Sequence, residues 1–430
     1  MSARYAHPKY SLKPLKEFID FVQYGISEIA TIEPIGVPML RMNNLQHDGW
    51  DLSNLKYIEL SSDQLEKYKI QKGDILFNRT NSKELVGKCE VFKENGDWVF
   101  ASYLIRVKLN QEKALPEFVS AFLNTNAGRL QIDRVSRQII GMSNVNAEEL
   151  KDLEIPLPPL DIQSNLISKI ESARAARQIK LSQAIELFKG IDQYLLEELG
   201  LKEPVKDKRN AYAVRVNQLG NTQRINADYF HPERMAVIHT MESKPNGMQV
   251  KRLADIVNFI RDTRKVSQDK RYFGLANVQS NTGVLFETIE DEAEGPCFEF
   301  IENDVLFARL RPYLNKVYRA EFSATCSTEF HVLRLGKSDI KVLPDYLATV
   351  LRSSLILAQT VHMMTGNTHP RLTNEDVTEL LIPIPNKISI QEKIANEAKR
   401  RQFEARRLRE EAEHEWQSAK ENFEKALLEG

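Results

Sequence analysis

The sequence is poor in cysteine. Its 430 residues include three cysteines, Cys89, Cys297 and Cys326, and they lie far apart. Disulfide frameworks and zinc sites need paired spacings, so neither is expected here. We expect these three side chains to be buried as small apolar groups.

The sequence also lacks long apolar runs. It contains no uninterrupted run of the roughly 18 apolar residues that a membrane-spanning helix needs. The first ten residues, MSARYAHPKY, lack the apolar core of a secretion signal. With 42% hydrophobic and 28% charged residues, the composition is that of a globular protein. We therefore expect a cytoplasmic protein with no membrane partner.

Motifs for bond chemistry are missing as well. There is no Walker phosphate loop, no G-x-G-x-x-G turn, no H-E-x-x-H helix and no G-x-S-x-G elbow. There is no Asn-Pro-Pro-aromatic motif of the adenine-N6 methyltransferases and no acidic nuclease cluster. His362 and His369 lie seven residues apart, which is not a standard spacing of metal ligands. The sequence predicts a chain without a catalytic residue, a metal site or a bound cofactor.

The formal net charge is −1, which by itself does not favour binding to nucleic acid. A neutral total can still contain basic surfaces, because acidic residues elsewhere offset them. Such acidic residues occur near the end of the chain, at Glu410, Glu411, Glu413 and Glu415. The total charge therefore neither supports nor excludes binding to nucleic acid.

What the sequence does contain is an internal repeat. Its copies are offset by 224 residues (His7 to His231) up to 230 residues (Asp74 to Asp304). The first copy has Tyr5-Ala6-His7-Pro8, Gly73-Asp74-Ile75-Leu76-Phe77-Asn78-Arg79, Ile155-Pro156-Leu157-Pro158-Pro159 and Ile162-Gln163. The second copy has Tyr229-Phe230-His231-Pro232, Asn303-Asp304-Val305-Leu306-Phe307-Ala308-Arg309, Ile382-Pro383-Ile384-Pro385 and Ile390-Gln391. Two copies of one module suggest a protein that engages a two-part target.

Each copy ends in a long helical segment. Residues 161–199 contain no proline and one glycine, and residues 388–428 contain neither. Apolar residues recur close to helical spacing in both segments, including Leu166, Ile170, Ile179 and Ile185 in the first and Ile394 and Phe403 in the second. These stripes need a partner, and we expect the two helices to pack together as an antiparallel coiled coil. A simple spacer role remains open.

The rest of each half mixes short strands and short helices. Helical stretches are expected from Pro116 to Arg134 and from Pro344 to about Thr365, with proline in the first turn. The predicted fold class is α+β: two similar α/β domains, joined by two long antiparallel helices in a pseudo-twofold repeat. The predicted segments are a first domain at 1–158, a helix at 159–200, a linker at 201–224, a second domain at 225–386 and a helix at 387–430.

The best candidate for a binding site follows the apolar strand of each copy. Arg79 and Arg309 come directly after the strand, where a rigid scaffold can present the planar guanidinium to a guanine edge or a phosphate. Lys88 and Lys316 follow a few residues later. Ordinary surface salt bridges of these arginines remain the alternative.

A second candidate lies in the loop before each proline segment. These loops read Gly141-Met142-Ser143-Asn144 and Gly366-Asn367-Thr368-His369-Pro370-Arg371. Glycine allows close backbone approach to a ligand, and the hydroxyl and amide groups can donate to phosphate or base edges. Asn146 and Thr373, which precede acidic residues, are expected to cap short helices.

In their ordered repetition, these motifs resemble the DNA-specificity subunit of type I restriction-modification enzymes, over nearly the whole chain. The resemblance implies two target recognition domains that read a bipartite, asymmetric site in double-stranded DNA. It also implies that the long helices bind two methyltransferase subunits, and that the full assembly adds restriction and translocase subunits. S-adenosylmethionine, ATP and magnesium are then expected on the partner subunits and not on this chain.

The resulting hypothesis assigns residues to two roles. The predicted DNA contacts are Asn78, Arg79, Asn81, Lys88, Ser143, Asn144, Arg309, Arg311, Lys316, Asn367, Thr368, His369 and Arg371. The predicted helix or subunit interface contains Leu166, Ile170, Ile394 and Phe403. Three alternatives stay open at this point: a specificity subunit of a related two-part type II or phage-defence methylation system, a coiled-coil scaffold without a DNA role, and an enzyme with an unrecognised site.

Overall fold

The computed structural model describes residues 8–46, 49–139, 142–204, 207, 211–214, 227–243, 248–265, 271–286, 295–336, 339–366 and 368–429. The chain forms two compact units, with residues 1–181 and 410–430 in unit 1 and residues 182–409 in unit 2. Both units contain parts of both long helices, so the predicted domain limits stay predictions. Most of the predicted linker at 201–224 lies outside the described residues. None of the described helices is long and apolar enough to cross a membrane.

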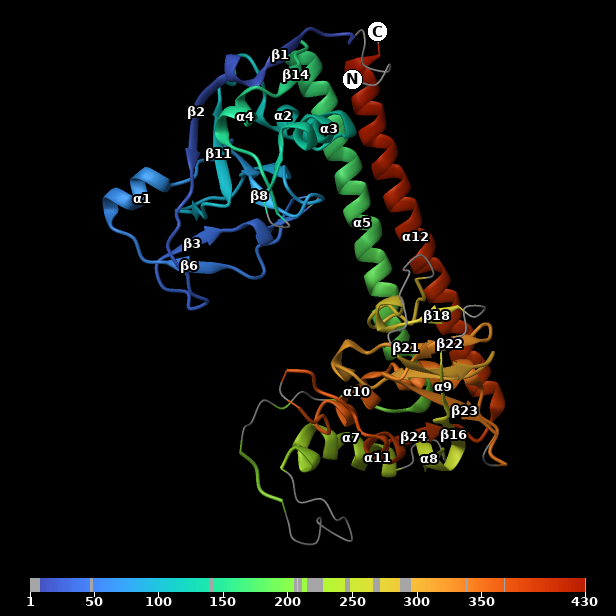
Figure 1. Cartoon of the computed structure of the whole chain (residues 1–430). Helices are drawn as coiled ribbons and strands as arrows, with labels where there is room; N and C mark the ends of the chain where they lie inside the picture. The colour runs from blue at the N-terminus through green and yellow to red at the C-terminus, as the bar shows by residue number, and fades with distance from the viewer. Residues whose placement is uncertain are drawn as a thin grey trace. The chain divides into compact units, whose positions relative to one another are not determined.

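The elements of the first half, in chain order, lead into one long helix (Figure 1). They are β1 (Leu12–Pro14), β2 (Ile19–Tyr24), β3 (Val37–Leu40), β4 (Leu45–Gln46), β5 (Gly49–Trp50), β6 (Lys56–Ile58), α1 (Ser62–Tyr68), β7 (Ile75–Asn78), β8 (Thr80–Asn81), β9 (Cys89–Val91), β10 (Val99–Phe100), β11 (Leu104–Leu109), α2 (Pro116–Leu123), α3 (Asn126–Val135), β12 (Arg137–Ile139), β13 (Met142–Asn144), α4 (Ala147–Lys151), β14 (Glu154–Pro156) and α5 (Leu160–Leu199).

The elements of the second half lead into another long helix (Figure 1). They are α7 (Pro232–Glu242), β15 (Gln249–Arg252), α8 (Leu253–Ile256), β16 (Val257–Ile260), β17 (Thr263–Lys265), β18 (Tyr272–Phe273), β19 (Pro296–Phe300), β20 (Val305–Ala308), β21 (Val317–Arg319), β22 (Ala324–Ser327), β23 (Phe330–Leu335), α9 (Pro344–Leu351), α10 (Ser354–Thr360), α11 (Asn374–Thr378), β24 (Leu381–Ile384) and α12 (Ile388–Leu428).

One four-stranded sheet of each unit has the same topology. In unit 1 the strand order is β2-β11-β7-β9, with all neighbours antiparallel. Unit 2 repeats this order as β16-β23-β20-β21. The apolar motif of each copy forms an inner strand, β7 or β20, in which all four residues are buried. The sequence repeat is therefore a structural repeat.

Two further strand pairings recur. Each unit has a second sheet with one parallel pair, β10 beside β3 in unit 1 and β18 beside β22 in unit 2. The isoleucine-proline motifs form β14 and β24, which pair antiparallel with β1 and β15. Directly after these edge strands the chain enters α5 or α12.

A buried ion pair explains the aspartate of the repeated motif. The Asp74 carboxylate accepts a hydrogen bond from Arg106 Nε at 2.6 Å and one from the backbone N–H of Gln71 at 2.7 Å. In unit 2, Arg334 donates twice to Asp304, each time at 2.8 Å. These pairs fasten β7 to β11 and β20 to β23 at the point where each motif strand begins.

The residue before each aspartate turns the chain with a positive φ angle. Gly73 has a φ of 90° and Asn303 a φ of 72°. Glycine and asparagine are the residues that tolerate this left-handed region best. The difference between the two motifs at this position therefore leaves the turn unchanged.

The isoleucine-glutamine motif has a structural role. Gln163 accepts a hydrogen bond from the Leu115 N–H at 2.9 Å and donates to the Lys113 carbonyl at 3.2 Å. Gln391 makes the same two bonds in unit 2, with the Leu343 N–H and the Lys341 carbonyl, both at 3.0 Å. Both glutamine side chains are buried. Each one links the start of a long helix to the chain that leads into α2 or α9.

The predicted helical stretches begin as expected, and each contains two helices. Pro116 and Pro344 lie in the first turns of α2 and α9. The first stretch consists of α2 and α3, and the second consists of α9 and α10, which ends at Thr360. The Thr125 hydroxyl accepts from the Gly128 N–H and so begins α3 as a new helix.

The predicted helix caps are confirmed. The Asn146 side chain accepts from the N–H groups of Glu148 and Glu149. Thr373 accepts from the Asp376 N–H, and the Asp376 side chain accepts from the Thr373 N–H in return. Both are capping boxes, which satisfy backbone donors at the start of α4 and α11.

The long helices pack antiparallel in both units (Figure 1). In unit 1, Arg177 of α5 contacts Glu413 of α12, while Lys180 contacts Glu411, which lies earlier in α12. In unit 2, Glu198 of α5 contacts Lys393 of α12. These surface ion pairs report the direction of the helices, whereas buried apolar contacts supply most of the stability.

Each helix also packs against the globular part of the unit. Leu166 and Ile170 join the core of unit 1, together with Trp416 and Phe423 of α12. Ile394 is 1% exposed and joins the core of unit 2 with Leu195. In each unit the hydrophobic core thus includes side chains of both long helices. The helices pack against the globular part of the unit as well as against each other.

Three predicted stripe residues do not face the partner helix. Phe403 is 70% exposed, Ile179 is 58% exposed and Ile185 is 47% exposed. Their assignment to the helix-helix contact is therefore wrong. For Phe403, a role in binding another subunit stays a prediction.

The buried ion pair of unit 1 can be tested by substitution. Arg106→Ala leaves the Asp74 carboxylate buried without its cation, so we expect unit 1 to lose about 3 kcal/mol of unfolding free energy. All three tryptophans, Trp50, Trp98 and Trp416, lie in unit 1, so urea unfolding followed by tryptophan fluorescence reports on this unit. Lys108→Ala removes an exposed charge from the same strand and serves as the control. Equal midpoints for the two variants would contradict the account.

A second comparison tests the helix contacts. Ile394→Asp places a carboxylate in the core of unit 2, and we expect it to cost about 3 kcal/mol or more and to lower the melting temperature. Phe403→Asp, at an exposed position of the same helix, should change stability by less than about 0.5 kcal/mol. Thermal unfolding followed by circular dichroism measures both. Similar melting curves would mean that the packing of α12 is misassigned.

Candidate DNA interface

In unit 1, the two regions that the sequence nominated separately lie side by side. β8 follows Arg79 directly and pairs with β13, which carries Ser143 and Asn144. The Arg79 carbonyl accepts a hydrogen bond from the Val145 N–H at 2.9 Å. The sheet therefore holds the strand exit and the loop in one fixed arrangement.

The Arg79 guanidinium is oriented by two neighbours. Its Nη2 donates to Asn144 Oδ1 at 3.3 Å, and Asn144 in turn donates to Thr80 Oγ1 at 3.1 Å. Its Cζ lies 4.8 Å from the centre of the Tyr24 ring. Tyr24 is held by the Ala147 N–H, which donates to its hydroxyl at 2.9 Å. Because a guanidinium on an aromatic face loses little freedom on binding, this arrangement suits recognition of a planar acceptor pair.

Three predicted contacts of unit 1 are not available at this surface. Asn78 is fully buried and donates to the Leu85 carbonyl at 3.2 Å, so its assignment to DNA is wrong. Ser143 is 1% exposed and belongs to the strand pairing. Lys88 is buried and lines a cavity of about 390 Å³ together with Arg129 and Arg174, and Arg79 does not line this cavity. Asn81 is half-buried and remains a candidate.

In unit 2 the same connection forms. The Arg309 carbonyl accepts from the Leu372 N–H at 3.0 Å, and the Arg311 N–H donates to the Pro370 carbonyl at 2.7 Å. The loop itself closes through the N–H groups of Thr365 and Arg371, each of which donates to the other's carbonyl. The bond between Arg309 and Leu372 corresponds to that between Arg79 and Val145 in unit 1.

Arg371 already has an acidic partner. Its Nη2 donates to Glu329 Oε1 at 2.8 Å, and its Nε lies 3.1 Å from both carboxylate oxygens. The hydrogen bond to Glu329 raises the pKa of Arg371 above its usual value. A DNA phosphate or guanine would have to compete with Glu329 for this side chain. The pair therefore positions the loop, and sequence reasoning missed Glu329.

Arg311 has an unusual backbone. Its φ is 49° and its ψ 61°, a left-handed conformation that costs a residue with a side chain about 1 kcal/mol or more. Such strain is found preferentially at functional sites. Thr368 and His369 are exposed in the neighbouring loop, as a binding role requires, while Asn367 and Gly141 lie outside the described residues.

Two further polar groups of unit 2 are held inside the fold. Lys316 Nζ donates to the Leu275 carbonyl at 2.7 Å, and burial lowers its pKa. Its assignment to a phosphate contact is therefore not supported. His331 lies on β23, and burial, together with the charge of Arg309, lowers its pKa to about 3. It is neutral at physiological pH.

The arginines retain unused hydrogen-bonding capacity. Within the described part of the chain, the buried Nε groups of Arg79, Arg309 and Arg311 have no hydrogen-bond partner. Buried polar groups are nearly always paired in a complete structure. Among the described residues, buried Nε groups without a partner also occur at Arg41 and Arg174, outside these surfaces, so this feature does not by itself mark a ligand site.

Exposed aromatic side chains flank both arginine groups and were missed from the sequence. Tyr24 is 41% exposed and Tyr103 is 48% exposed, and the Tyr103 carbonyl accepts from the Arg79 N–H. Tyr313, two residues after Arg311, is 46% exposed. Sequence alternation could place these residues on strands or turns, but their exposure depends on how the sheet edges meet.

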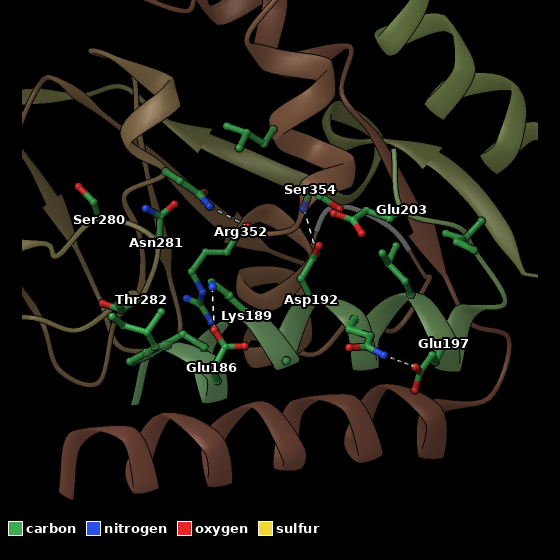
Figure 2. Close-up of a pocket in the computed structure, with 18 of the residues that line it drawn as sticks. Glu186, Lys189, Asp192, Glu197, Glu203, Ser280, Asn281, Thr282, Arg352 and Ser354 are labelled. Atoms are coloured by element: carbon green, nitrogen blue, oxygen red, sulfur yellow. Dashed lines mark hydrogen bonds and ion pairs between the residues drawn. The ribbon is translucent and has the colours of Figure 1, made fainter. Parts of the chain in front are cut away.

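Figure 2 shows a different kind of site, a cavity of about 930 Å³ in unit 2. The Asp192 carboxylate of α5 accepts from the Ser354 N–H at 2.9 Å and so caps α10. Burial raises the pKa of Asp192. Burial also lowers the pKa of Arg352 to about 10, and Arg352 donates to the Val317 carbonyl. Asp192 and Arg352 therefore make contacts within the fold.

The comparison with known proteins matches both copies of the repeat. The family model for the "Type I restriction modification DNA specificity domain" matches residues 13–186 and again residues 245–397. A putative type I restriction enzyme MjaX specificity subunit from Methanocaldococcus jannaschii is 27% identical over 165 residues, 38% of this chain and 39% of that protein. The EcoKI specificity subunit of Escherichia coli K12 is 25% identical over 168 residues, 38% of this chain and 36% of that protein. The chain thus matches less than half the length of these relatives.

Solved structures share the fold over nearly the full chain. An S subunit of a type I restriction-modification system from M. genitalium has a TM-score of 0.50 at 12% identity, covering 99% of this chain and 97% of that one. A chain from a structural study of type I R-M complex assembly has a TM-score of 0.52 at 15% identity, covering 98% of each chain. Because the family model matches both halves, this chain belongs to the family of type I restriction-modification DNA specificity domain proteins.

Proposed function

We propose that this chain is the noncatalytic specificity subunit of a type I restriction-modification system and reads a bipartite, asymmetric site in double-stranded DNA. The observation that carries the proposal is the repeated arginine surface. In each unit the same inner strand and the same loop connection present a half-buried arginine, Arg79 or Arg309.

The chemistry of the two surfaces suits base recognition. An arginine fork can donate to the O6 and N7 acceptors of guanine, and an asparagine amide can pair with adenine. Arg79 and Asn144 supply these groups in unit 1, and Arg309 and Arg311 supply the arginines in unit 2. Because the surrounding side chains differ between the units, each unit is expected to prefer its own half-site.

The partners follow from the same proposal. Two methyltransferase subunits are expected to bind the long helices, on which Ile179, Ile185 and Phe403 expose apolar surface. Restriction and translocase subunits complete the assembly. S-adenosylmethionine, ATP and magnesium are expected on these partners, and the assembly is expected in the cytoplasm, where its DNA lies.

Two other functions make different predictions. A specificity subunit of a related two-part type II or phage-defence system would use the same surfaces, and the neighbouring genes distinguish it. A coiled-coil scaffold without a DNA role predicts that Arg79 and Arg309 can be neutralised without effect.

The function can be tested by mapping N6-methyladenine at base resolution. DNA is compared from cells that express this chain with its neighbouring methyltransferase and from cells that express the methyltransferase alone. We expect a bipartite methylated motif that disappears without this chain. Identical maps from a pair of proteins that co-purify would contradict the proposal.

The role of Arg79 can be measured on the mapped motif. For Arg79→Ala in the assembled methyltransferase complex, we expect a loss of about 1–3 kcal/mol in binding to a duplex with the motif. Lys93→Ala is the control, because it removes the same charge from a surface residue whose Nζ lies 3.1 Å from Glu171 of α5. Fluorescence anisotropy at a fixed salt concentration gives both affinities. Equal losses for the two variants would remove Arg79 from the base-reading surface.

A further inference from the structure

Three possible metal ligands meet in unit 2. The ligand atoms of His231, Glu233 and His362 all lie within 4.8 Å of one another. His362 Nε2 lies 3.3 Å from Glu233 Oε2. Glu233 and His362 are 129 residues apart in the chain. Because of this separation, a search for metal ligands at short sequence spacings does not find the whole group.

The fold positions two of these side chains at the start of α7. His231 is the residue that caps the helix, and its Nδ1 accepts from the Glu233 N–H at 3.3 Å. In the neutral imidazole, Nε2 then carries the ring proton, so a metal ion bound through His231 would replace this cap bond. Pro232 fixes the first turn, so His231 and Glu233 emerge from one rigid corner.

The two imidazole rings stack beside the carboxylate. Their centroids are 3.7 Å apart, with an angle of 10° between the ring planes. Tyr212 meets the His231 ring edge-on at 5.5 Å. Parallel rings direct their lone pairs along parallel planes, so binding of one ion requires one ring to turn about its Cβ–Cγ bond. That torsion is soft for histidine.

We propose that His231, Glu233 and His362 bind one divalent transition-metal ion, with zinc as the natural candidate. Two imidazole nitrogens and one carboxylate oxygen are a ligand set that zinc accepts, whereas magnesium and calcium prefer oxygen ligands alone. A bound ion would take the place of the hydrogen bond between His362 and Glu233.

The position of the group indicates what an ion would do. It would tie the first turn of α7 to His362, which lies three residues before Thr365 at the base of the loop that ends in Arg371. If that loop contacts DNA, the ion would help to position a DNA-binding loop, and this part of the inference rests on the proposed function. The metal site itself does not.

The first copy of the repeat lacks two of the three ligands, although His7 corresponds to His231. At the offsets of the repeat, Lys9 corresponds to Glu233 (233 − 224) and Val135 to His362 (362 − 227). Neither side chain is a usual ligand for this class of ion. The site is therefore specific to unit 2, and we expect one ion per chain.

Metal binding can be measured on the purified full-length chain. The protein is stripped with a chelator, dialysed against zinc and analysed for bound metal, and its affinity is obtained by competition with a chromophoric chelator. We expect one zinc ion per chain, and a loss of affinity of at least about tenfold in His362→Ala and in Glu233→Gln. Glu233→Gln keeps the backbone N–H that His231 accepts from, so α7 retains its cap.

The control is His239→Ala, which removes an exposed histidine from the same helix and should bind zinc like the wild type. Cobalt(II) substitution provides a second readout, because a d–d absorption band of a nitrogen- and oxygen-ligated ion should appear in the wild type and not in His362→Ala. No stoichiometric zinc in the wild type, or equal affinity in all variants, would overturn the proposal. Neither outcome depends on methylation or DNA binding, so failure of the metal site is distinguishable from failure of the proposed function.

Discussion

In each unit, a buried aspartate at the start of the motif strand fixes where the rest of that strand goes. Asp74 and Asp304 sit after a turn of positive φ, and each is paired with an arginine of the neighbouring strand. A carboxylate in such a place is costly unless it is paired and hydrogen-bonded, so the register of the strand is strongly specified. Five residues later, Arg79 and Arg309 leave the sheet at equivalent points. The position of the arginine surface depends on this anchoring.

The same scaffold carries different side chains at its surface. The glutamines Gln163 and Gln391 and the two inner strands are nearly the same in both units. In contrast, Arg79 is oriented by Tyr24 and Asn144, whereas the corresponding surface of unit 2 contains a strained Arg311 and a loop held by an ion pair. The buried hydrogen bonds and the inner strands are therefore the same in both units, whereas the exposed residues differ. This separation is what a protein with two distinct half-sites needs.

Local features of the fold were predictable from the sequence because local rules determine them. The long helices, the prolines of α2 and α9 and the capping boxes at Asn146 and Thr373 depend on residues close in the chain. The errors arise where tertiary contacts decide. Asn78 looks like a polar group at a strand end, but the loop at Leu85 covers it, and Phe403 fits a helical stripe although nothing buries it. The metal-ligand group joins residues from distant parts of the chain, so no spacing rule could reveal it.

The central claim is that each unit reads its own half of a DNA site. The most direct test compares wild-type and Arg309→Ala complexes on duplexes in which one half-site at a time carries single base-pair substitutions. We predict that Arg309→Ala loses discrimination at one position of one half-site, by about 1–3 kcal/mol, and keeps full discrimination in the other. Equal loss of discrimination in both half-sites, or no loss in either, would contradict the claim.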